Sequence, residues 1–280
     1  MTPPHPPRQS LATGFRDVDS SGDTHACQRC LDTIAGIPFF HEIKEATFRI
    51  IAATGPSRVL DAGCGSGTDL VTLSTILPAG CQLTGLDTSQ SLLALASERT
   101  RSIQDRCSLV RGDITQIPVK ASVFDACRID RVLQHLHEPH NGIRELVRIL
   151  RPGGTLVAFD NDWDTFSISL DDRDTVSRIR QSWRDSFASG RIGCDLPRFF
   201  KDSGLTAIHT EPRTLTLNDL ALADQVFDLP DLLGWMVQDG TLAPDEPDSI
   251  REELCIKAGE GVFTSGYTGF LVWGTKPPSP

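Results

Sequence analysis

The sequence predicts an α/β fold in which a doubly wound sheet of about seven strands carries helices on both faces. Between residues 55 and 160, short apolar runs typical of buried strands alternate with segments of helical periodicity. A glycine-rich turn follows the first of these apolar runs. The 280-residue chain is also long enough for one such core and an elaboration of it.

The two ends of the chain differ from this core in composition. Residues 1–24 are rich in Pro, Ser, Gly and Asp, which predicts a disordered arm, and residues 277–280 read as a tail. Residues 25–54 are expected to form an N-terminal helical cap, with a helix over about 27–54 that stops at Gly55-Pro56. The side chains expected on its inner side are Phe39, Ile43, Phe48 and Ile51.

Residues 55–217 are expected to form the core, because strand-like and helix-like segments alternate there. Such alternation indicates a parallel sheet, whose neighbouring strands are joined by helical crossovers. Strands are predicted at 57–63, 81–87, 107–113, 123–129 and 155–160. Helices are predicted at 68–77, 90–102 and 143–150, the second capped by Ser89. The turn "RPGG" ends the third helix before the strand "TLVAFD".

The C-terminal part predicts a helical insertion before the last strand. A helix is expected over 174–188, followed by strands within 205–217 and 259–276. Between them, residues 218–258 read as a mostly helical lid, because the segment is longer than a simple crossover requires.

Charge and composition limit the classes of partner. The formal net charge is −10 and no run of Lys or Arg occurs, which disfavours nucleic acid and anionic lipid surfaces. No secretory signal or membrane-spanning run is recognisable, so a cytoplasmic location is expected. Cys27 and Cys30 form a single CxxC pair, too few ligands for a structural zinc site, so no metal is predicted. Oligomeric state is left open.

The turn "DAGCGSG" after the first strand indicates a nucleotide-type cofactor in a Rossmann-like fold. Gly63, Gly65 and Gly67 let main-chain N–H groups approach a ligand at the start of the next helix. A nicotinamide site prefers a third glycine where Thr68 stands, so the fit to that cofactor is imperfect.

Four elements in order resemble the class I S-adenosylmethionine-dependent methyltransferases. They are the loop at Asp61–Gly67, "LTGLDTS" with Asp87 and Thr88, "VRGDITQIPV" with Asp113 and Ile114, and "LRPGGTLVAFD". The resemblance is to bacterial small-molecule enzymes, including ubiquinone and menaquinone C-methylases and sugar O-methyltransferases.

The resemblance implies S-adenosylmethionine as the cofactor and a role for each matching residue. Asp61 would hold the methionine ammonium, Asp87 the ribose hydroxyls and Asp113 the adenine amino group. The remaining residues expected at the cofactor are Gly63, Cys64, Gly65, Thr88, Ile114 and Arg128. Taken singly, Asp87 and Asp113 also suit ordinary turn or cap positions.

The segment "RIDRVLQHLHEPH" is where the resemblance places the acceptor. It implies His135 as a base and Asp160 as its partner or as a substrate anchor. A histidine here also suits a packing or capping role in the next helix. Side chains that compete for contact with the acceptor are Asp130, Arg131, Asp162, Trp163 and Asp164.

The predicted function is methyl transfer to O, N or C of a small, secondary metabolite. The Asn/Asp-Pro-Pro-aromatic motif of amino-methylating enzymes that act on nucleic acid or glutamine is replaced here by "RIDR". Alternatives are a cyclase or isomerase that keeps the cofactor without methyl transfer, a nicotinamide-dependent oxidoreductase, and a non-catalytic binding module.

Overall fold

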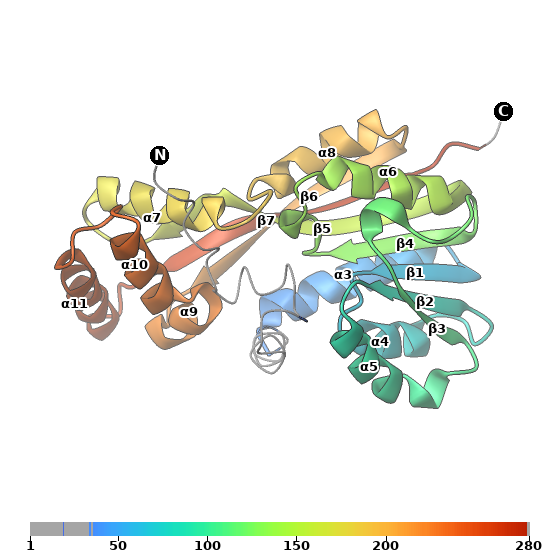
Figure 1. Ribbon diagram of the computed structural model, residues 1–280, viewed down its shortest axis with the longest axis horizontal. Helices are drawn as coiled ribbons and strands as arrows, with labels where there is room; N and C mark the ends of the chain where they lie inside the picture. Colours follow the sequence, from blue (N-terminus) through green and yellow to red (C-terminus); the bar gives the residue numbers. More distant parts are fainter. Residues whose placement is uncertain (1–18, 20–33, 35, 279–280) are drawn as a thin grey trace.

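The computed structural model describes residues 19, 34 and 36–278 (Figure 1). In this part of the chain, seven strands form one sheet in the order β3-β2-β1-β4-β5-β7-β6. The strands from β1 to β5 run parallel, and β7 is antiparallel to both β5 and β6. The strands are β1 (Arg58–Ala62), β2 (Gln82–Asp87), β3 (Cys107–Arg111), β4 (Phe124–Asp130), β5 (Leu150–Ile168), β6 (Thr206–Leu217) and β7 (Ser265–Thr275).

Helices cover both faces of the sheet, which confirms the predicted fold class (Figure 1). One face carries α3 (Pro38–Ala53), α4 (Thr68–Ile76) and α5 (Gln90–Arg99). The other face carries α6 (Pro139–Ile149) and α8 (Ile192–Asp202). Short 3₁₀ turns occur at Arg101–Ile103, Ile114–Gln116 and Leu133–His135. Strand order reverses between β1 and β4, and ligands of such sheets bind beyond the strand ends at this point.

The helix ends follow local capping chemistry. Ser89 caps α5 as predicted, because its Oγ accepts a hydrogen bond from the Leu92 N–H at 3.1 Å. Within the helix expected over about 27–54, the described residues show helix at Ile34, a turn at 36–37, and α3 from Pro38, where a proline at the first position costs no hydrogen bond. Residues 1–18, 20–33 and 35 lie outside the described residues, and with them all of the expected arm at 1–24 except Asp19, and the Cys27–Cys30 pair.

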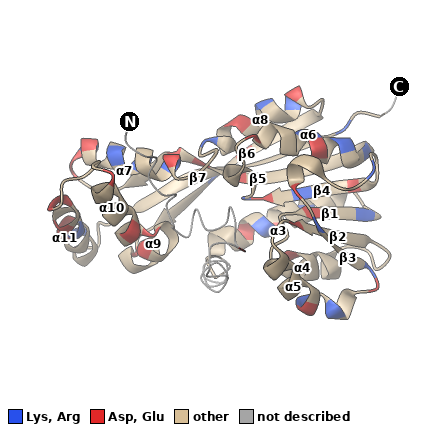
Figure 2. Cartoon of the chain, viewed as in Figure 1, with Lys and Arg blue, Asp and Glu red and all other residues tan. Residues whose placement is uncertain are grey.

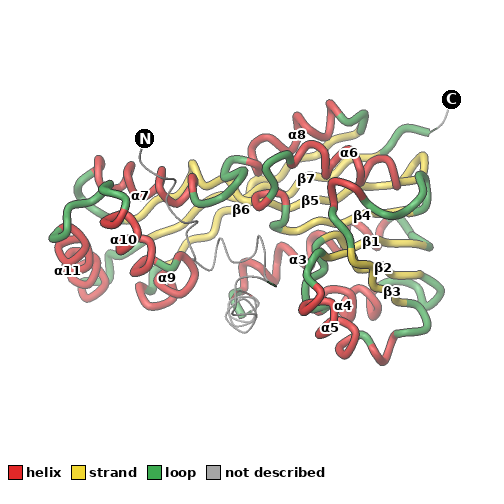
Figure 3. The backbone as a smooth tube through the Cα atoms, viewed as in Figure 1, coloured by secondary structure: helices red, strands yellow, loops and turns green. Residues whose placement is uncertain are grey.

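Strand β5 is much longer than the predicted strand at 155–160, and this changes the shape of the molecule. It begins at Leu150 and runs to Ile168, through the segment "NDWDTFSI", which lies beyond the end of the predicted strand. Pairing with β7 holds the extension, from Asp162↔Thr268 to Ile168↔Ser265, across a bulge. Figure 3 shows β5, β6 and β7 running on beyond the ends of the other strands.

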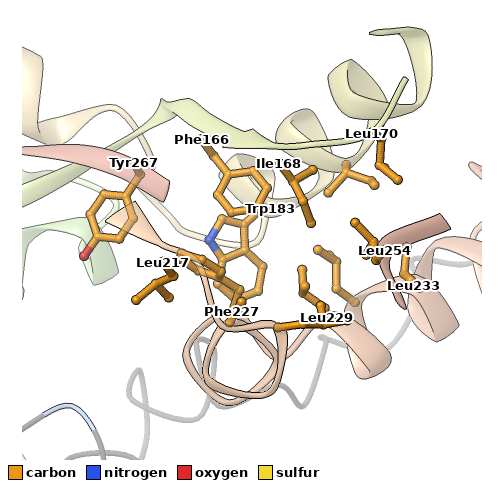
Figure 4. Close-up of a cluster of buried hydrophobic side chains, with 14 of the residues drawn as sticks. Phe166, Ile168, Leu170, Trp183, Leu217, Phe227, Leu229, Leu233, Leu254 and Tyr267 are labelled. Carbon is orange, nitrogen blue, oxygen red and sulfur yellow. The ribbon is translucent and has the colours of Figure 1, made fainter. Parts of the chain in front are cut away.

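Helices α7 (Arg173–Asp185), α9 (Leu220–Phe227), α10 (Leu229–Gln238) and α11 (Glu246–Gly259) pack on this extension and form a second lobe (Figures 1 and 3). Its core includes Phe166, Trp183, Phe227 and Tyr267 (Figure 4). Full burial of each such side chain contributes roughly 1.5–3 kcal/mol. The lobe therefore has a hydrophobic core of its own beside the two that flank the sheet.

Charged residues of both signs are scattered over the helices in the view of Figure 2. Of the described helices, none combines the length and the apolar character that crossing a bilayer requires.

Candidate functional site

A cavity of about 360 Å³ lies where the carboxyl ends of the parallel strands meet the second lobe. One set of lining residues comes from the strand ends and the turns after them: Gly63, Gly65, Leu86, Asp87, Thr88, Asp113 and Ile114. A second set comes from the lobe: Trp163, Trp183, Phe187, Val226, Asp228 and Tyr267. A third set comes from the end of β4 and the segment after it: Asp130, Arg131, Gln134 and His135.

The glycine turn after β1 fits a cofactor against its backbone. Gly63 has a φ of +73°, and a Cβ there would lie 2.2 Å from Val132 Cγ2, so this glycine is required by packing. Gly65 has a φ of +51°, yet a Cβ there would meet nothing within 4 Å. Because Gly65 lines the cavity, that Cβ would project into the space a cofactor would fill.

Asp87 and Asp113 line the cavity and also have structural hydrogen bonds. Asp87 accepts the Gly65 N–H at 2.8 Å and the Ser89 N–H at 2.9 Å, which ties β2 to the glycine turn. Burial raises the pKa of the Asp87 carboxyl, against these backbone N–H donors. Asp113 Oδ1 accepts the Thr115 N–H at 2.7 Å and starts a 3₁₀ turn. Thr88 and Ile114 lie beside these two carboxylates on the cavity wall.

Asp61 and Arg128 are not among the residues that line the cavity, so contact of either with the cofactor stays a prediction. They are in-register neighbours on β1 and β4, and their side chains form an ion pair of 2.9 Å, each 2% exposed. Arg128 also binds Asp69 Oδ2 at 3.0 Å and Asp130 Oδ2 at 2.8 Å. Burial raises the pKa of Asp61 to about 6, against the opposing attraction of Arg128.

Cys64 also lies outside the cavity wall. Its thiol is buried against β2, where a Cβ on Gly85 would lie 2.7 Å from the Cys64 sulfur. Burial raises the pKa of the thiol, so it stays protonated near neutral pH. Contact between its side chain and a cofactor stays a prediction.

His135 lines the cavity, whereas Asp160 lies behind the wall and is fully buried. The Asp160 carboxylate accepts the Gln134 N–H at 3.2 Å and the Asn161 N–H at 3.0 Å. His135 Nε2 lies 3.4 Å from Gln134 Nε2, and its ring packs 5.7 Å from the Phe187 ring. Asp160 therefore holds the backbone of the turn that carries His135.

We expect Asp160→Asn to reduce the pH dependence of the free energy of unfolding between about pH 4 and 7. Burial raises the pKa of Asp160 from 3.8 to about 7, so its stabilising contribution is present below pH 4 and is lost as pH rises through 7. Asparagine cannot ionise, so relative to wild type the variant should gain roughly 4 kcal/mol across this window, at about 1.4 kcal/mol for each unit of the pKa shift. Urea titrations at successive pH values measure it, with half-exposed Asp195→Asn as the control, and parallel curves for Asp160→Asn and wild type would contradict it.

The five side chains that were expected to compete for contact with the acceptor separate into two groups. Asp130, Arg131 and Trp163 line the cavity. Asp162 and Asp164 do not, and Asp164 instead forms ion pairs with arginines on the surface. Asp130 binds Arg131 at 3.0 Å, and although burial opposes it, Arg131 and Arg128 hold the Asp130 pKa well below its usual range.

Several cavity residues were not among those predicted as candidates for the site. Gln134, Asn161 and Tyr267 all line the cavity. Gln134 had a usable signal, since it precedes His135 in the segment already assigned to the acceptor. Tyr267 had none, because it reaches the cavity only through the antiparallel pairing of β7 with β5 and β6.

Comparison with known proteins gives one family and a set of relatives. Residues 60–158 match the family model described as a methyltransferase domain. An uncharacterized 37.1 kDa protein in transposon TN4556 of Streptomyces fradiae is 33% identical over 200 residues, which cover 71% of this chain and 58% of the relative. The demethylmenaquinone methyltransferase of Clavibacter sepedonicus is 34% identical over 112 residues, covering 40% of this chain and 44% of the relative. The chain thus spans about half the length of these relatives.

Solved structures extend the likeness to the whole chain. The crystal structure of the [4+2]-cyclase SpnF superposes with a TM-score of 0.57 at 17% identity, covering 98% of this chain and 97% of that one. At this identity the likeness shows the fold, including the part beyond residue 158, and no more.

Proposed function

Because residues 60–158 of the chain form a methyltransferase domain, we propose that the protein transfers a methyl group from S-adenosylmethionine to a small acceptor molecule in the cavity. The cofactor of this domain is S-adenosylmethionine, which supplies a methyl group already activated by its sulfonium. The observation that carries the proposal is the continuity of the cavity, which joins the glycine turn, Asp87 and Asp113 to the aromatic residues of the lobe. The net charge of −10 supports a small acceptor over a nucleic acid.

The strand ends provide the groups that would hold the cofactor. Gly65 leaves room against the backbone, Asp87 offers carboxylate oxygens to the ribose hydroxyls, and Asp113 and Ile114 would contact the adenine. Asp61 on β1 and Arg128 on β4 form a buried ion pair that joins these two strands. Contact of either side chain with the cofactor stays a prediction.

His135 is the base that we assign to an acceptor with a hydroxyl or amine proton. Its imidazole lines the cavity, and the residue lies in the 3₁₀ turn Leu133–His135. Asp160 acts through the backbone: its bonds to the Gln134 and Asn161 N–H groups hold the turn and the strand beside it. Asp160 is therefore a positioning residue and His135 a catalytic one.

We expect His135→Ala to slow methyl transfer by roughly 10²–10⁴-fold while leaving cofactor affinity within about 2-fold. The reason is that proton removal is lost while the glycine turn, Asp87 and Asp113 are untouched. The measurement is the rate of S-adenosylhomocysteine formation by mass spectrometry with a panel of phenols, amines and hydroxy acids, beside calorimetric titration of the cofactor. His137→Ala is the matched control, because His137 lies outside this cavity. An equal rate in both variants would remove the assignment of His135.

A second candidate function keeps the cofactor but uses the cavity for cyclisation or isomerisation. The full-length likeness to a [4+2]-cyclase is the observation that favours it. The two functions differ in mass balance, because methyl transfer yields one S-adenosylhomocysteine for each product and raises the product mass by one methylene. A product of unchanged mass, formed without S-adenosylhomocysteine, would favour the second function.

A further inference from the structure

The lobe side of the cavity is walled by aromatic rings. Trp163 stacks on Phe187 with ring centroids 5.0 Å apart and planes 11° apart, and it contacts Tyr267 at 4.4 Å. Trp183 meets Trp163 edge to face at 5.4 Å. Rings held against one another in this way present fixed, flat, apolar surfaces, which suit a flat apolar ligand.

Within this wall, one chain of hydrogen bonds fixes the orientation of two amides. The Trp163 indole N–H can only donate, and it donates to Gln134 Oε1 at 3.0 Å. The oxygen of Gln134 therefore faces Asn161, whose Nδ2 donates to the same atom at 3.1 Å. This leaves Asn161 Oδ1 turned away from Gln134, as the acceptor end of the chain.

Asn161 Oδ1 is buried and accepts no hydrogen bond from the described residues. Asn161 is one of the residues that line the cavity, and it is only 3% exposed. A buried acceptor left unsatisfied costs about 1–3 kcal/mol. A ligand that donates a hydrogen bond to this oxygen would recover that cost, and a ligand without a donor would not.

The charges around the cavity disfavour an anionic ligand. Of the described residues that line it, Arg131 is the one Lys or Arg, and its guanidinium binds Asp130 at 3.0 Å and lies over the Phe40 ring at 4.6 Å. Asp228 adds a further carboxylate to the lobe side. An acceptor bearing a carboxylate or phosphate would meet more negative than positive charge.

We propose that the acceptor is a flat, uncharged aromatic molecule that donates a hydroxyl or amino hydrogen bond to Asn161 Oδ1. The inference rests on the proposed function, since it names the acceptor class of the same cavity. Asn161 is then a specificity residue, held in orientation by Gln134 and Trp163.

The test compares 2-naphthol, 2-methoxynaphthalene and 2-naphthoate, which share a ring system and differ in the donor and the charge. With the protein saturated in S-adenosylhomocysteine, calorimetry should give 2-naphthol an affinity at least about 10-fold above that of either other compound. Asn161→Leu should reduce the preference for 2-naphthol over 2-methoxynaphthalene to below about 2-fold. Asn141→Leu, the same change on α6 outside the cavity, should leave it unchanged.

The outcomes separate this inference from the proposed function. Equal affinity of wild type for 2-naphthol and 2-methoxynaphthalene overturns the inference, whether or not Asn161→Leu folds. A preference that survives in folded Asn161→Leu also overturns it, because the hydrogen bond would then lie elsewhere, for instance to an ordered water. Failure of S-adenosylhomocysteine to bind overturns the proposed function, and the naphthalene series then still tests the pocket in the protein without cofactor.

Discussion

Replacing Gly65 by alanine is expected to weaken S-adenosylmethionine binding by about 10- to 100-fold. The added Cβ meets no protein atom within 4 Å and so projects into the cavity beside Asp87. Overpacking a fitted contact by one methyl group costs about 1–3 kcal/mol, which corresponds to this loss of affinity. Isothermal titration of the purified variant with S-adenosylmethionine measures the change.

Gly55→Ala is the matched control for the backbone. Gly55 has a φ of +59°, close to the +51° of Gly65, and a Cβ there also meets nothing within 4 Å. It lies between α3 and β1 and does not line the cavity. Both substitutions should cost about 1–2 kcal/mol of folding free energy, since both place alanine in the left-handed region. Equal cofactor affinity in the two variants would show that the cofactor does not lie against Gly65.

Replacing Arg128 by methionine is expected to destabilise the fold by about 3–5 kcal/mol. The substitution keeps an unbranched side chain in the core but leaves the carboxylates of Asp61, Asp69 and Asp130 facing one another without their shared cation. Removing one partner of a buried ion pair costs this much, and here the buried Asp61 carboxylate loses its cation, whereas Asp69 keeps Lys44 at 2.7 Å and Asp130 keeps Arg131 at 3.0 Å. Urea denaturation followed by tryptophan fluorescence gives the free energy of unfolding.

The loss in Arg128→Met should also depend on pH. Without the cation, the pKa of the buried Asp61 carboxyl rises further above that of the unfolded chain, so the variant loses stability as pH rises and its deficit is smaller at pH 4 than at pH 8. Arg151→Met is the control, because Arg151 pairs with Asp125 at a side-chain exposure of 41% and should cost at most about 1 kcal/mol. A deficit for Arg128→Met as small as that of Arg151→Met would contradict a structural role for the network.

The parallel half of the sheet could be predicted because its signals are local. Each of the strands from β1 to β4 is a short apolar run between turn residues, and Ser89 caps the following helix with its own side chain. The extension of β5 could not be predicted from residues 161–168, since it depends on pairing with β7, about a hundred residues later in the chain. Helix α8 was missed as well, and it contains Pro197, a residue that usually argues against a helix interior.

The same difference between local signals and long-range pairing decides which residues of the site could be predicted. Asp87, Asp113 and His135 reach the cavity because they stand at or just beyond the carboxyl ends of strands, which a strand prediction already places. Asp61 and Arg128 stand inside their strands, so which face they point to depends on the register of β1 against β4. That register turns both side chains toward α3 and α4, where Arg128 donates to Thr47 at 2.8 Å. A sequence pattern does not contain this cross-strand information.

The central claim is that the glycine turn and the two strand-end aspartates bind S-adenosylmethionine. The most direct measurement is isothermal titration of the wild-type protein with S-adenosylhomocysteine and, separately, with NADH. The account predicts saturable binding of one S-adenosylhomocysteine per chain with a Kd of about 1–100 μM, roughly −8 to −5.5 kcal/mol, and no binding of NADH. Binding of NADH alone, or no saturable binding of S-adenosylhomocysteine up to millimolar concentration, would contradict it.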